Sequence, residues 1–286
     1  MMRKSHSGFT LVEMIVVMVI TGIIGGMVAI FIKAPVQGYV DSRRRAEMTD
    51  IADTALRRIT RDIRTALPNS IRITVVGADT YLEFLPVSGS GRYRAGAALS
   101  GTQAGCGSLA LDMLDFTAAD TCFEVLGPMP TMVAGATPDK LVIYNRGPTV
   151  PATGADAYVA DNTAAFVSNT AKTVAIGSKL FPFQSPGSRF QVINTPVTYV
   201  CAPVAGGVGG TLTRYWGYAI TDPQPTAPGT LTSVNLGAQL ASKVDTCSIT
   251  YGAVGQRLAL VTLQLTLTDS GESVTLYNAA HVSNVP

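Results

Sequence analysis

One acidic residue, Glu13, lies in an otherwise uncharged and largely apolar segment that extends from Phe9 to Ile32. A segment of about 24 residues forms about 36 Å of helix, which is enough to cross a hydrocarbon core of about 30 Å. A carboxylate at membrane depth costs about 2.5 to 3.5 kcal/mol on insertion scales, so such residues normally have a partner and a function. The chain must therefore build its fold on a membrane-spanning helix whose one charge needs a partner.

The residues before this segment are polar and basic. They carry Arg3 and Lys4, end at Gly8, and contain no apolar core of their own. An ordinary secretory signal has its apolar region before the cleavage site. Cleavage after Gly8 would instead keep the apolar segment and create an amine on Phe9. That amine is largely cationic at neutral pH, and pairing it with Glu13 would make both charges tolerable in lipid.

Residues 8 to 13 read Gly-Phe-Thr-Leu-Val-Glu, which resembles the class III signal of type IV prepilins and type II secretion pseudopilins. The resemblance implies cleavage after Gly8 and N-methylation of Phe9 by a prepilin peptidase. It also implies that Glu13 pairs with the amine of a neighbouring subunit during filament assembly. The alternative is a single-span protein whose Glu13 lies near the lipid headgroups.

Charges on the two sides of the apolar segment predict its orientation. Arg3 and Lys4 place the N-terminus in the cytoplasm, and everything after Lys33 is then exported. Three later arginines, residues 43–45, argue weakly against this orientation, since acidic residues are interleaved with them.

Past Pro35 the pattern becomes that of an amphipathic helix with one buried stripe. Its apolar members recur at steps of three and four: Met48, Ile51, Ala52, Ala55, Ile59, Ile63 and Ala66. Pro68 supplies the stop. We therefore expect a helix over residues 9–67, kinked or broken at Pro35. Residues 45–73 resemble the same part of PilW-like minor pilins and of J-type pseudopilins.

From Ile71 onward the chain is rich in Val, Thr, Ala and Gly and poor in charge. Strands are predicted at 71–76, 81–85, 140–144, 189–193, 197–200, 211–219, 247–251 and 258–268, with a hairpin returning at 273–277. Long surface loops are predicted at 86–108 and 147–175.

The expected fold is therefore α+β and pilin-like, with a long N-terminal helix packed on a mainly antiparallel β head. Its parts are a cleaved leader (1–8), a transmembrane helix (9–32), a periplasmic amphipathic helix (33–70) and a globular head (71–286). We favour a single core for this head.

All four cysteines fall in the part of the chain that would be exported: Cys106, Cys122, Cys201 and Cys247. An even number of cysteines in an oxidising compartment favours disulfides. Of the three connectivities, Cys106 with Cys122 and Cys201 with Cys247 is favoured, because each pair closes one region locally. A four-cysteine zinc site is the rival, although it normally contains close cysteine pairs that this sequence lacks.

Catalysis finds little support in the sequence. The only histidines are His6, in the leader, and His281, near the end, so a nucleophile with a histidine base would depend on His281. We expect no enzyme activity, no cofactor, no metal and no small-molecule substrate. The net charge of +2 gives no electrostatic support to nucleic-acid binding.

Two features of the head remain open. Asp156, Asp161 and Asn162 could hold calcium, although their spacing fits no regular calcium loop and a solvated turn is the alternative. Trp216 belongs either to a binding surface at a filament tip or to an aromatic strand in the core.

Together these features predict a minor pilin of a type IV pilus, placed near the filament tip. The expected partners are other minor and major pilins, the prepilin peptidase and the inner-membrane assembly platform. The expected location is the Gram-negative inner membrane with a periplasmic head, and the cell surface once the chain is in a pilus. A J-type pseudopilin and a tip adhesin are the alternatives.

Overall fold

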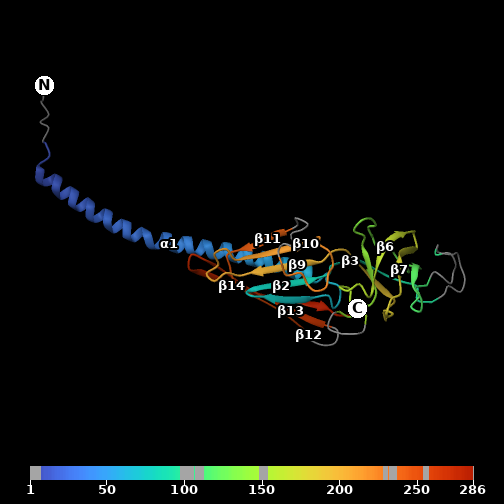
Figure 1. Ribbon diagram of the computed structural model, residues 1–286. Helices are drawn as coiled ribbons and strands as arrows, with labels where there is room; N and C mark the ends of the chain where they lie inside the picture. Colours follow the sequence, from blue (N-terminus) through green and yellow to red (C-terminus); the bar gives the residue numbers. More distant parts are fainter. Residues whose placement is uncertain are drawn as a thin grey trace, which may run out of the picture. The chain divides into compact units, whose positions relative to one another are not determined.

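A long helix, α1 (Leu11–Ile63), precedes a series of strands, β1 to β14 (Figure 1). The computed structural model describes residues 8–96, 106, 113–147, 154–227, 231, 237–253 and 258–285. Every strand pairing in these residues is antiparallel. The structure thus confirms the expected α+β class, with one long N-terminal helix and a mainly antiparallel β head.

The N-terminal part of α1 runs through Pro35 without interruption. A proline inside a helix removes one backbone hydrogen bond and crowds the preceding turn, but a long helix tolerates one such site. The break that the sequence left open is therefore absent.

The last part of α1 carries the predicted buried stripe. Its buried members from residue 49 onward are Ala52, Ala55, Leu56, Ile59 and Ile63. The helix ends at Ile63, earlier than the predicted residue 67, because the amides of Thr65 and Ala66 donate to carbonyls three residues back, on Asp62 and Ile63. The Leu67 amide then donates to the Leu85 carbonyl at 2.7 Å, which carries the chain into a sheet.

Two of the three sheets lie close to this part of the helix in space (Figure 1). The five-stranded sheet has the order β1 (Arg72–Val76), β2 (Asp79–Phe84), β9 (Val197–Ala202), β10 (Thr211–Trp216), β11 (Gly237–Ser242). The three-stranded sheet is β12 (Val244–Ala253), β13 (Leu258–Asp269), β14 (Glu272–Ser283). The alternation predicted for β13 is confirmed, since Val261, Leu263, Leu265 and Leu267 are buried.

The six-stranded sheet was largely missed from the sequence. Its order is β3 (Val87–Arg92), β8 (Arg189–Ile193), β5 (Lys140–Val142), β6 (Thr163–Asn169), β7 (Thr173–Lys179), β4 (Asp120–Glu124). The prediction of long loops at 86–108 and 147–175 is therefore wrong over β3, over β6 and at the start of β7. Of these, β3 consists mainly of glycine and serine, which have low strand preference. At Gly91 in β3, an added Cβ would come within 2.6 Å of the Phe190 ring, so close packing explains the glycine.

Buried side chains of the head, Thr49–Pro286, form separate clusters within one compact unit. The six-stranded sheet has an aromatic cluster in which Phe123 and Phe190 meet edge to face, with ring centroids 5.6 Å apart. Another cluster joins Leu67 and Leu85 to Val142 and Ile193. The single core favoured from the sequence stays a prediction.

A buried ion pair links β1 to β2. Glu83 is fully buried, and its Oε1 accepts hydrogen bonds from Arg72 Nη2 at 2.6 Å and Nε at 2.9 Å. The hydroxyls of Tyr218 and Thr198 donate to Oε2 at 2.9 and 3.2 Å. The Arg72 guanidinium also lies 3.6 Å from the centroid of the Tyr158 ring. Burial raises the pKa of the Glu83 carboxyl, while Arg72 opposes that rise.

A second polar group ties the end of α1 to the five-stranded sheet. Asp62 Oδ2 accepts hydrogen bonds from the Tyr199 hydroxyl at 2.8 Å and from Arg214 Nε at 2.9 Å. Burial, and then Asp62, raise the pKa of Tyr199. Asp62 therefore fixes the helix end on β9 and β10.

Both disulfides have the connectivity favoured from the sequence. Cys201 in β9 is joined to Cys247 in β12, across a separation of 46 residues, and Cys106 is joined to Cys122 in β4 across 16. The first bond connects the five-stranded to the three-stranded sheet. The second attaches residue 106 to the six-stranded sheet.

Replacing Cys201 and Cys247 together by alanine should lower the free energy of unfolding by about 2 to 4 kcal/mol, because the bond restricts the unfolded chain. The measurement is urea unfolding of the full chain in detergent, followed by circular dichroism. Dithiothreitol should destabilise the wild type further than this variant, which lacks one reducible bond. An unchanged urea midpoint in the variant would contradict the prediction.

Buried tyrosines predict a loss of stability at alkaline pH. Burial raises the pKa of five phenols: Tyr81, Tyr93, Tyr158, Tyr199 and Tyr218. In the unfolded chain they lose protons near their ordinary pKa of about 10, whereas the folded chain keeps them. The folded state then binds more protons, so stability is complete below this pH and falls as pH rises through it.

The check is urea unfolding from about pH 8 to pH 11, together with the absorbance of ionised tyrosine. Tyr199→Phe should flatten the pH dependence, and Tyr277→Phe should leave it unchanged because Tyr277 is 66% exposed. Ionisation of these buried phenols before unfolding would refute the account.

Candidate functional site at the N-terminus

The start of α1 is set by Thr10. Its Oγ1 accepts a hydrogen bond from the Glu13 amide at 3.3 Å, and its carbonyl accepts one from the Met14 amide at 3.2 Å. Thr10 thus caps the helix, with Glu13 three residues later, as in a capping box. Our sequence analysis missed this role of Thr10, although the Thr-x-x-Glu spacing signals it.

Glu13 lies in the first turn of α1 with an exposed side chain. A negative charge there is favoured by the partial positive charge of the helix N-terminus. None of the ion pairs between residues that the structure describes includes Glu13. The carboxylate is therefore positioned by the helix and accessible to a cation from outside the chain.

Gly8 and Phe9 precede the helix and are exposed. A Cβ added to Gly8 would meet nothing within 4 Å. Packing against the described residues therefore does not require glycine at this position. A requirement for glycine here would have to come from another molecule that reads the segment.

The first part of α1 presents apolar side chains on all sides. Met18 is 72% exposed and Phe31 is 82% exposed. Thr21 donates its hydroxyl to the Val17 carbonyl at 2.7 Å, so this polar group is satisfied within the helix. By length and composition α1 can cross a membrane, and none of its most apolar window is buried within the chain. An apolar surface of this extent needs a lipid or protein environment.

Residues 3–29 match the family model of the prokaryotic N-terminal methylation motif. This match supports a type IV pilin-like or pseudopilin protein. The motif and the apolar helix fit a membrane-anchored pilin-like protein. No curated protein and no solved structure matches the chain. The match includes Gly8, Phe9 and Glu13. It also includes Arg3, Lys4 and His6, which lie outside the residues that the structure describes.

The other residues singled out in the pilin-like chain lie in the head, Thr49–Pro286. Trp216 is half-buried at the end of β10, with the Arg214 guanidinium 4.7 Å from its ring centroid. His281 is exposed on β14.

Two of the three possible calcium ligands, Asp156 and Asn162, have hydrogen bonds within the chain, while Asn162 Oδ1, the atom that could bind calcium, is buried with no partner among the described residues. Asp156 Oδ1 accepts a hydrogen bond from the Tyr158 amide at 2.9 Å. Asn162 is fully buried and donates to Asn145 Oδ1 at 3.3 Å. Within the described parts of the chain, no three His, Cys, Asp or Glu residues form a group that could hold a metal ion.

Proposed function

We propose that the chain is a minor pilin that is cleaved after Gly8, methylated on Phe9 and assembled through Glu13 into a type IV pilus. The observation that carries this proposal is a capped, exposed Glu13 in the first turn of an apolar helix, inside a methylation motif. The chain acts as a structural subunit and not as an enzyme.

Assembly in this proposal is driven by charge pairing and apolar burial. The Phe9 amine of one subunit is cationic near neutral pH, and methylation keeps its charge. It pairs with Glu13 of the neighbouring subunit in a medium where each charge alone would be costly. The apolar surface of α1 moves from lipid into the filament core. Repeated contacts of this head-to-tail kind do not close, so they build an open helical polymer.

The finer proposal is an MSHA-type pilus, since residues 45–73 resemble the MSHA pilus biogenesis protein MshO. The chain then lies in the Gram-negative inner membrane with its N-terminus cytoplasmic and its head periplasmic. Other pilins, prepilin peptidase and the assembly platform are its partners. A head of about 215 residues favours low copy number near the tip. The same helix resemblance favours a J-type pseudopilin as the second candidate, and the half-buried Trp216 favours a tip adhesin as the third.

The test is the intact mass and N-terminal sequence of the protein purified from membranes. We expect a chain that starts at N-methylated Phe9. Gly8→Val should retain the leader, whereas the matched control Gly22→Val, also at a position where an added Cβ meets nothing within 4 Å, should be processed. A wild-type chain that starts at Met1 in a host with active prepilin peptidase would overturn the proposal.

Deletion of the gene separates the candidate functions. Loss of surface pili would support the minor pilin, and loss of protein secretion with pili intact would support the pseudopilin. Normal pili that no longer attach to cells or glycans would support the adhesin.

A further inference from the structure

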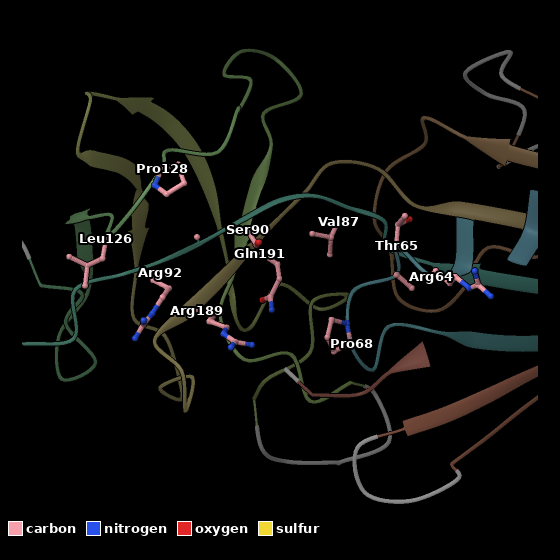
Figure 2. A pocket seen from close by; sticks show the side chains of 12 residues that line it. Arg64, Thr65, Pro68, Val87, Ser90, Arg92, Leu126, Pro128, Arg189 and Gln191 are labelled. Atoms are coloured by element: carbon pink, nitrogen blue, oxygen red, sulfur yellow. The ribbon is translucent and has the colours of Figure 1, made fainter. Parts of the chain in front are cut away.

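A cavity of about 620 Å³ lies beside β3, the end strand of the six-stranded sheet. Among described residues, its lining includes three arginines, Arg64, Arg92 and Arg189, and no acidic side chain. None of the ion pairs between described residues uses these arginines. Figure 2 shows Arg92 and Arg189 together, with Arg64 farther along the cavity. The cavity thus gathers positive charge without a countercharge from the described residues.

Two of these arginines are cross-strand neighbours. Arg92 in β3 lies directly opposite Arg189 in β8, and Ser90 lies opposite Gln191. Residues opposite each other, and residues two apart in a strand, share a face of the sheet. One face therefore presents two guanidiniums, a hydroxyl and an amide, all lining the cavity (Figure 2). Like charges directly opposite each other are destabilising, and an anion between them would remove this repulsion.

The outer edge of β3 is open between two contacts with its own chain. At one end the Val87 amide donates to the Thr65 carbonyl at 2.8 Å, and at the other the Leu126 amide donates to the Arg92 carbonyl at 2.7 Å. In a regular strand, the backbone groups of Ser90 point to the same side as those of Arg92. No backbone hydrogen bond between described residues occupies Ser90 on that side. The edge thus offers one donor and one acceptor beside the paired arginines.

We propose that this gap binds an extended, acid-bearing segment of a neighbouring subunit. The segment adds to the edge of β3 through Ser90 and places a carboxylate between Arg92 and Arg189. Strand addition supplies backbone hydrogen bonds at an open edge, and arginine forks bind carboxylates with two parallel hydrogen bonds. Gln191 Oε1 is a buried acceptor with no hydrogen-bond partner among the described residues, which favours a ligand with amide donors over a simple inorganic anion. That the partner is a filament subunit rests on the proposed function.

The experiment uses the full chain in detergent and a fluorescent peptide, acetyl-Val-Glu-Thr-Glu-Val-amide, with binding followed by anisotropy. The Arg92→Glu/Arg189→Glu variant should weaken binding roughly tenfold or more, since it removes charge-assisted hydrogen bonds. Arg61→Glu is the matched control and should bind as the wild type does, because Arg61 is exposed and does not line this cavity. A peptide with glutamine in place of glutamate should bind weakly.

A second variant, Ser90→Pro, removes the edge amide and leaves the arginines in place. Proline is tolerated where a strand edge faces solvent, and unchanged circular dichroism would show that the fold is kept. We expect it to lose the peptide. Equal binding of both peptides, no binding by the wild type, or binding by Ser90→Pro as tight as the wild type would overturn the proposal. Competition by inorganic phosphate as strong as that by unlabelled peptide would also overturn it, in favour of a small-anion site.

The same arginine variant separates this inference from the proposed function. In cells this variant should still start at N-methylated Phe9, because processing depends on the N-terminal motif. It should nevertheless enter pili less well than Arg61→Glu. Normal entry into pili would overturn the inference and leave the proposed function standing. A wild-type chain that is never processed would overturn the proposed function. The peptide titration would still test whether the cavity binds an acidic segment.

Discussion

Glu13→Gln should be processed and inserted normally but should enter filaments about 100-fold less well. Glutamine keeps the length and shape of the side chain and removes only its charge. The amine on Phe9 of the neighbouring subunit would then lie unpaired in an apolar filament core. Removing one partner of a buried ion pair costs about 3 to 5 kcal/mol, which is a factor of about 100 or more in an equilibrium.

The measurement is the amount of the chain in sheared pili relative to the amount in membranes, by quantitative immunoblot. Thr10→Ala is the matched control. It removes the cap on the Glu13 amide, worth about 0.5 to 2 kcal/mol of helix stability, and keeps the carboxylate. If both variants enter pili equally poorly, Glu13 acts through the helix start. If Glu13→Gln enters normally, the charge-pairing account fails.

The sequence predicted those parts of the fold that repeat at short range. The stripe through Ala52, Ala55 and Ile59 has helical spacing, and β13 alternates between apolar and polar residues, so each pattern points to one structure. The N-terminal site could be proposed from the sequence for a similar reason, because Gly8, Phe9 and Glu13 lie within one short motif, and the roles of these residues stay a prediction. Cysteine connectivity followed from simple proximity along the chain.

The parts that were missed depend on partners far away in sequence. β3 contains glycine and serine and becomes a strand because it packs on Phe190 and pairs with β8. Its neighbour in the sheet is about 100 residues away in the chain, and no local pattern encodes that pairing. The paired Arg92 and Arg189 were missed for the same reason, since each looks like an ordinary surface cation until the register is known.

The buried pair in the head should be the most sensitive point of its stability. Glu83→Gln should lower the free energy of unfolding by about 3 kcal/mol, the lower end of the range for a broken buried pair, because Arg72 loses its buried partner and keeps only the half-exposed Asp222, 3.3 Å from its Nη1. Arg72 has only 11% of its side chain exposed and Glu83 has none. Urea unfolding of the full chain in detergent measures the loss. Arg57→Met is the control, since its pair with Asp53 is exposed and is worth less than about 1 kcal/mol.

The variant with both charges replaced, Arg72→Met/Glu83→Leu, tests whether the pair contributes net stability or specifies the strand register. Two apolar side chains of similar size remove the cost of burying charge, so this variant should recover most of the stability lost in Glu83→Gln. When the carboxylate is gone, the hydroxyls of Tyr218 and Thr198 are placed so that one can donate to the other. Arg72 lies directly opposite Glu83 in the pairing of β1 with β2, and a slip by one residue would turn every side chain of β1 to the other face. If the double variant is stable but gives broadened or doubled amide signals for β1, the pair specifies register. If it is as unstable as Glu83→Gln and gives single signals, the pair contributes net stability.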